Sequence, residues 1–110
     1  MARILFTVIG YVFYEGSKES LADILLKSGL EVDLGHWALR FPTIEGSFEL
    51  GYEGNNDKEH PFCVNANSFN FSNLRDISER IGRALKKERI DFEFTIFDEL
   101  KEIITISSVS

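Results

Sequence analysis

The stretch DFEFTI at residues 91–96 decides the fold class, because apolar and polar residues alternate throughout it. Successive side chains of a strand point to opposite faces, so this alternation is typical of a strand with one buried face and one wet face. Two further rows of bulky residues repeat the pattern: Phe48, Leu50 and Tyr52, and Trp37, Leu39 and Phe41. The chain therefore predicts a largely antiparallel sheet with an aromatic face.

Two stretches of the chain have the marks of helices. Residues 18–28 follow a capping serine, Ser17, and precede Gly29, which suits the left-handed position after a helix. A second helix should begin at Ser72 or Asn73 as its N-cap, because Leu74, Ile77, Ile81 and Leu85 recur at helical spacing.

We expect six strands around these helices, at residues 3–14, 32–41, 47–53, 62–66, 91–97 and 102–109. The order predicts a single α+β domain over residues 1–110, with two helices on one face of the sheet. The first choice is a ferredoxin-like (split βαβ) variant with an extra C-terminal strand. The alternative is a more open, strongly curved sheet that cradles the helices. Apolar residues on both faces of the first strand predict a central strand that is covered on both sides, at least in part.

Charge and composition limit the possible functions. The net charge of −6 argues against general nucleic-acid binding, which relies on surplus positive charge. No stretch approaches the ~20 apolar residues of a membrane helix, and residues 1–10 are interpreted as a strand because Thr7 interrupts the apolar run. A single cysteine, Cys63, makes no internal disulfide and is interpreted as a core residue. We expect a cytoplasmic protein.

No residue constellation predicts catalysis or a cofactor. His36 beside Trp37, and His60 three residues before Cys63, lack the further partners that a catalytic or zinc site needs. The oxygens of residues 55–59 do not follow the spacing of a calcium loop. The basic residues of the second helix are interrupted by acids, so a solvated helix face explains them better than an RNA surface. We predict no metal and no cofactor; whether the chain is an enzyme stays open, with binding favoured over turnover.

The acidic residues supply the functional hypothesis. We expect a small protein-binding domain, most concretely an immunity protein or inhibitor that covers the basic site of a bacterial toxin such as a nuclease. The first partner-binding group expected is Glu45, Glu49, Glu53, Asp57 and Glu59, and the second is Asp91, Glu93, Asp98, Glu99 and Glu102.

Two alternatives remain open at this point. One is a small enzyme or ligand-binding domain with a pocket between the aromatic sheet face and the helices, near His36, Trp37 and Tyr52. The other is an accessory subunit that self-associates through an exposed strand edge.

Overall fold

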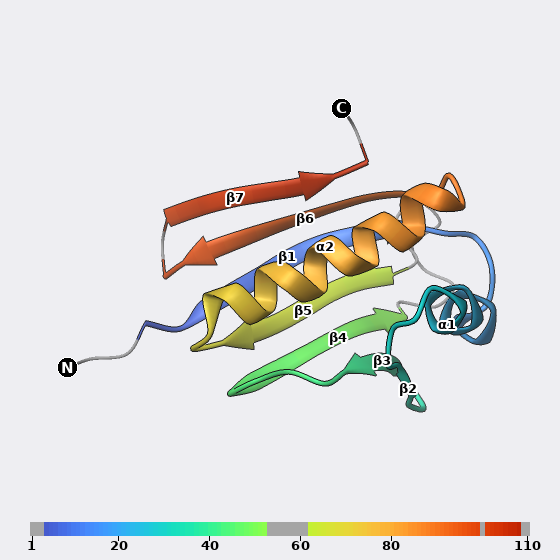
Figure 1. Cartoon of the computed structure of the whole chain (residues 1–110), viewed down its shortest axis with the longest axis horizontal. Helices are drawn as coiled ribbons and strands as arrows, with labels where there is room; N and C mark the ends of the chain where they lie inside the picture. Colours follow the sequence, from blue (N-terminus) through green and yellow to red (C-terminus); the bar gives the residue numbers. More distant parts are fainter. Residues whose placement is uncertain (1–3, 53–61, 100, 109–110) are drawn as a thin grey trace.

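Seven strands form one antiparallel sheet in the order β2-β3-β4-β5-β1-β6-β7, and two helices pack on one of its faces (Figure 1). This computed structural model describes residues 4–52, 62–99 and 101–108. The elements are β1 (Phe6–Phe13), α1 (Lys18–Lys27), β2 (Asp33–Leu34), β3 (Ala38–Phe41), β4 (Gly46–Tyr52), β5 (Phe62–Ser68), α2 (Phe71–Lys87), β6 (Asp91–Asp98) and β7 (Lys101–Ser107). The predicted α+β class, antiparallel sheet and two-helix face are confirmed.

The strand order is compatible with the predicted ferredoxin-like arrangement. The four central strands follow the order β4-β5-β1-β6, in which β1 lies between the strands that flank α2 in sequence. The expected extra C-terminal strand is β7, which pairs with β6 at one edge. The short strands β2 and β3 extend the opposite edge.

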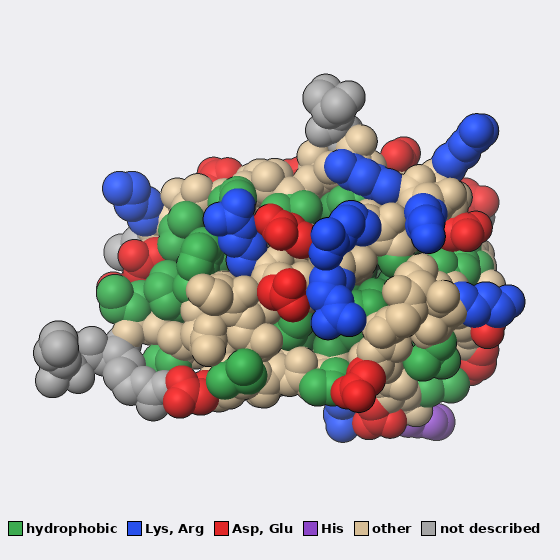
Figure 2. Space-filling model, viewed as in Figure 1, with side chains coloured by type: hydrophobic (Ala, Val, Ile, Leu, Met, Phe, Trp, Pro, Cys, Tyr) green, Lys and Arg blue, Asp and Glu red, His purple; other side chains and the backbone are tan. Residues whose placement is uncertain are grey.

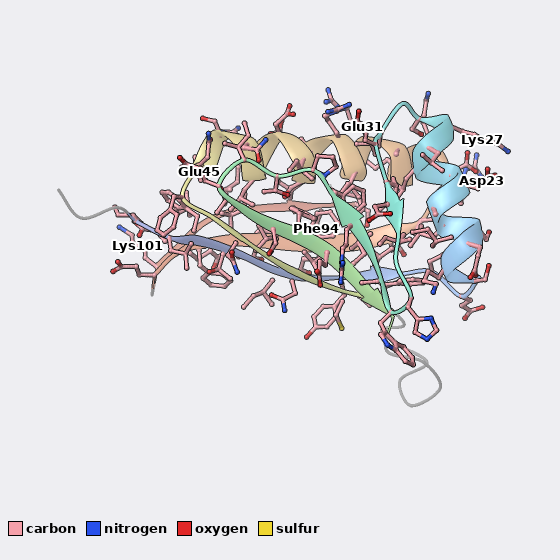
Figure 3. The ribbon with its side chains drawn as sticks, turned by 90° about the horizontal axis from the view of Figure 1, so that it is seen from below. Asp23, Lys27, Glu31, Glu45, Phe94 and Lys101 are labelled. Carbon is pink, nitrogen blue, oxygen red and sulfur yellow. The ribbon has the colours of Figure 1, made fainter. Side chains whose placement is uncertain are left out.

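The core fills the layer between the sheet and the helices. The predicted alternation is confirmed on β4 and β6, where Phe48, Leu50, Phe92, Phe94 and Ile96 are buried. The stripe predicted for α2 is also buried and packs against them: Leu74, Ile77, Ile81 and Leu85. Figure 3 shows α2 along one side of the strands. Burial of this apolar stripe gives the helix most of its stability, because helices in proteins are stabilised mainly by the packing of an amphipathic face.

The two helices end in the same way. The Leu30 amide donates to the Leu25 carbonyl at 3.2 Å, and Gly29 has a φ of 90° as predicted. At the end of α2 the Ile90 amide donates to the Leu85 carbonyl at 2.9 Å. Here the left-handed position is occupied by Arg89, with a φ of 58°, instead of glycine.

The N-cap of α1 is predicted correctly and that of α2 is not. Ser17 accepts a hydrogen bond from the Ser20 amide at 3.0 Å. In α2 the cap is Asn70, whose Oδ1 accepts from the Asn73 amide at 3.0 Å. The helix therefore begins earlier than expected, because Phe71 already belongs to its first turn and packs on Phe6 with ring centroids 5.2 Å apart.

The prediction of one continuous strand over residues 32–41 is wrong, because residues 35–37 interrupt it. The Gly35 amide donates to the Ala38 carbonyl at 2.9 Å, which closes a tight turn and splits the segment into β2 and β3. Trp37 lies in this turn and is 75% exposed, so it does not extend the buried row of Leu39 and Phe41. The alternating spacing predicts that Trp37 belongs to that row, because spacing alone does not show at which residue a strand begins.

The first strand is central in the sheet, as predicted, but the expected cover on its second side is not found among the described residues. Val8 and Val12 of β1 are buried under the helices, whereas Ile9, Tyr11 and Phe13 are exposed on the other side. Both helices lie on the Val8 side, since Val8 and Val12 belong to the same buried cluster as the apolar residues of α1 and α2. The strand β1 thus has one buried face and one solvent-exposed face, and the solvent-exposed face carries apolar residues.

Candidate partner-binding surface

The sheet face turned away from the helices is uncovered in the described part of the chain; we call it the open face. Alternation and strand register place its side chains on six strands. They are Arg40 of β3, Ser47 and Glu49 of β4, Cys63, Asn65 and Asn67 of β5, Thr7, Ile9, Tyr11 and Phe13 of β1, Asp91, Glu93, Thr95 and Phe97 of β6, and Thr105 of β7.

Apolar and aromatic side chains form the centre of the open face. Ile9 is 53% exposed, and Tyr11 and Phe13 are each 39% exposed, all on the central strand β1. The rings of Tyr11 and Phe13 lie with centroids 6.4 Å apart. Single exposed apolar residues are ordinary on protein surfaces, but three in succession along a central strand form a row.

Polar and acidic residues flank this row on both neighbouring strands. In the register, Tyr11 lies between Cys63 of β5 and Glu93 of β6, and Phe13 lies beside Asp91. Ile9 lies between Asn65 and Thr95 in the same way. An apolar centre with a polar rim is the arrangement found in protein–protein interfaces, where aromatic residues are enriched at the centre.

Cys63 belongs to this surface, which corrects the prediction that it is a core residue. It is half-buried on the open face, while its neighbours Phe62 and Val64 point into the core. The apolar run around Cys63 suggested burial, but on a strand only every second residue shares the core side. Its predicted neighbour His60 lies outside the described residues.

The structure describes two of the five residues in the first acidic group. Glu49 lies on the open face, as its alternation with Phe48 and Leu50 predicts, and its carboxylate accepts from Arg40 Nε at 3.1 Å. Glu45 lies in the turn before β4, at the end of the sheet where α2 begins (Figure 3). Glu53, Asp57 and Glu59 lie outside the described residues. Arg40 partly neutralises the negative charge of Glu49, so the described part of the first acidic group is less negative than the sequence suggests.

The second acidic group is divided between the open face and a turn. Asp91 and Glu93 are exposed on β6 beside Phe13 and Tyr11. Glu102 of β7 accepts a hydrogen bond from Thr105 Oγ1 at 2.7 Å, next to the same face. Asp98 and Glu99 lie at the β6–β7 turn, where Glu99 adopts a φ of 53°. The acidic residues that adjoin the aromatic row are therefore Asp91 and Glu93.

The other candidate residues do not form a recognisable chemical site. His36 and Trp37 contact each other edge to face, with ring centroids 4.5 Å apart, in the exposed turn between β2 and β3. Neither lies in the layer between the sheet and the helices, where the ligand pocket is expected. Within the described ranges, no group of three His, Cys, Asp or Glu side chains could hold a metal ion.

Tyr11 and Phe13 are the residues of this surface that sequence reasoning missed. The signal was present, because strand residues 6–13 are apolar on both faces. This pattern predicts burial on both sides, whereas both helices pack on the side of Val8 and Val12 and leave the other side exposed. Neither helix of the described chain has the length and apolar character needed to cross a bilayer.

Comparison with known proteins leaves the family of this chain open. No protein-family model, no curated protein and no solved structure matches it. The functional argument therefore rests on the residues of the open face and on the charge distribution of the chain.

Proposed function

We propose that the chain is a small protein-binding domain that holds a basic protein partner on its open face. In its most concrete form it is an immunity protein that neutralises a bacterial toxin in the cytoplasm, with a nuclease as the clearest case. The observation that carries the proposal is the exposed row of Ile9, Tyr11 and Phe13 beside the acids Asp91 and Glu93. Large exposed aromatic side chains dominate the binding energy of many interfaces.

The size of the open face supports a protein as the occupant. The five longer strands, β4, β5, β1, β6 and β7, each have seven or eight residues. At about 4.8 Å between strands and about 3.3 Å per residue, they span a face of roughly 600 Å². This is about three quarters of the surface of about 800 Å² that each partner buries in a stable protein complex, so a partner on the open face would also contact its rim. An open sheet face of this extent suits another protein surface better than a small molecule, which binds in concave sites.

The charge of the chain supports a basic partner. The net charge is −6, and Asp91 and Glu93 lie beside the aromatic row. The active site of a nuclease must be positively charged to hold phosphate, so an acidic cover fits it by charge. Complementary charge also raises the association rate, which an inhibitor of a lethal enzyme requires.

The test is co-expression of this chain with the basic protein encoded directly beside its gene, followed by co-purification and measurement of the dissociation constant. The double variant Tyr11→Ser with Phe13→Ser should weaken binding by about 30-fold or more, since loss of a central anchor costs about 2 kcal/mol or more. Protection of cells from the partner should fall in parallel.

The matched control is Trp37→Ser with Leu26→Ser, which removes two exposed apolar side chains that lie off the open face. We expect this control to bind normally. If the control loses function and the open-face variant retains it, the alternative ligand site near Trp37 is favoured. Self-association of the purified chain through the open face, detected by sedimentation, would equally contradict the proposal.

A further inference from the structure

A groove lined by basic residues lies between the two helices, on the opposite side of the molecule from the open face. Its volume is about 470 Å³, and its lining residues are Ser28, Leu30, Arg80, Arg83, Ala84 and Lys87. The α2 residues at positions 80, 83, 84 and 87 share one stripe, because residues three and four apart lie on the same side of a helix. Figure 2 shows Lys and Arg side chains gathered over α2 on this face.

The cations of the groove have few competing partners. Arg83 and Lys87 make no ion pair with any residue that the structure describes. Arg80 Nη1 lies 3.9 Å from Asp76 Oδ2, and both side chains are largely exposed. An exposed pair at this distance contributes little free energy, so Arg80 can turn to a ligand without a large loss.

A second cavity, whose lining is partly polar, adjoins the groove at Leu30 and Arg80. It has a volume of about 260 Å³ and adds Phe41, Pro42 and Ile77 with Glu31 at its rim. One end of the combined groove therefore presents cations, and the other presents the exposed ring of Pro42 beside the carboxylate of Glu31.

We propose that this groove binds a small organic polyphosphate, with the phosphates on Arg80, Arg83 and Lys87 and the organic group on the Phe41 and Pro42 side. Arginine forks match phosphate oxygens in geometry and charge. The three cations extend from residue 80 to residue 87, a rise of about 10 Å along the helix, which is longer than one phosphate group and suits a chain of them.

A small ligand fits this groove better than a nucleic acid. Long nucleic acids are attracted by extended positive surfaces, whereas this chain has a net charge of −6 and would repel a polyanion at long range. A compact ligand that enters the groove contacts the local cations at short range, where the acids of the opposite face are screened.

The test is calorimetric titration of the purified chain with adenosine triphosphate and with inorganic tripolyphosphate at physiological ionic strength. We expect saturable one-to-one binding, tighter for the nucleotide because its base packs against Pro42 at the far end of the groove. Lys87→Gln and Arg83→Gln should each weaken nucleotide binding by about tenfold, as expected for a charge-assisted hydrogen bond.

The matched control is Lys86→Gln, which removes the same charge from the adjacent residue, outside the lining of the groove. It should change the affinity by less than about twofold, and all three variants should keep the wild-type melting temperature. Equal losses for Lys86→Gln and Lys87→Gln would overturn the proposal, since they would indicate a diffuse basic surface. The absence of saturable binding, or tighter binding of a single-stranded RNA oligonucleotide than of the nucleotide, would overturn it as well.

Discussion

The ring of Phe92 lies directly against the backbone of α2 at Gly82: a Cβ atom at position 82 would lie 2.7 Å from Phe92 Cζ. The missing side chain allows β6 and α2 to approach closely, and both residues are buried. Glycine inside a helix is normally unfavourable by about 1 kcal/mol relative to alanine. Its presence in the middle of α2 therefore has a packing reason.

Gly82→Ala should destabilise the protein even though alanine is the better helix former. Overpacking costs about 1–3 kcal/mol, which exceeds the gain in helix preference, so we expect a net loss of about 1 kcal/mol in urea unfolding. In a Phe92→Leu background the clash is relieved, and the same substitution should become neutral or stabilising. Strictly additive effects of the two substitutions would show that the ring and the helix do not compete for this space.

Arg89→Gly should stabilise the protein. Arg89 holds a left-handed conformation with a φ of 58° at the end of α2, which an L-residue adopts at a cost of about 1 kcal/mol and glycine adopts freely. We expect the melting temperature to rise by about 4 °C. The matched change at the end of α1, Gly29→Ala, should lower it, because Gly29 occupies the equivalent position with a φ of 90°. A fall in melting temperature for Arg89→Gly would contradict this prediction. It would mean that the Arg89 side chain stabilises the protein by more than its left-handed backbone conformation destabilises it.

Cys63 provides a chemical probe of the open face. It is half-buried in register with Tyr11, so a thiol reagent should modify the folded protein without global unfolding. A bulky adduct there should block partner binding, and bound partner should slow the modification. The Cys63→Ser protein treated with the same reagent is the control and should bind normally. If the modified protein bound the partner with unchanged affinity, the centre of the open face would not be part of the interface.

The sequence predicts the buried side of this fold well because burial follows periodicity. The stripe of Leu74, Ile77, Ile81 and Leu85 and the alternation around Phe94 each depend on neighbours within one element. Local spacing is enough to decide which of their side chains face inward. The caps at Ser17 and Gly29 are local in the same sense, because their hydrogen bonds join residues three to five apart.

The candidate site was harder to predict because it depends on which face of the sheet the helices cover. The exposed side of β1 is as apolar as a buried one, so Tyr11 and Phe13 become visible as surface residues only when both helices are placed. Trp37 shows the opposite error: its spacing suits the core, and the Gly35–Ala38 hydrogen bond places it in solvent. The proximity of Glu93 to Tyr11 follows from β1–β6 pairing, which joins residues more than 80 positions apart.

The most direct test of the proposed function is the association rate constant between this chain and its basic partner, measured by stopped flow at low and at physiological salt. If the open face is the interface, Asp91→Lys with Glu93→Lys should lower the rate constant by about tenfold or more at low salt. The wild-type rate should fall steeply as salt screens the field. The control, Glu19→Lys with Glu88→Lys, makes the same change in net charge on the helices and should slow association much less. Equal slowing by both double variants, or no slowing by the open-face variant, would contradict the proposal that the partner docks on the open face.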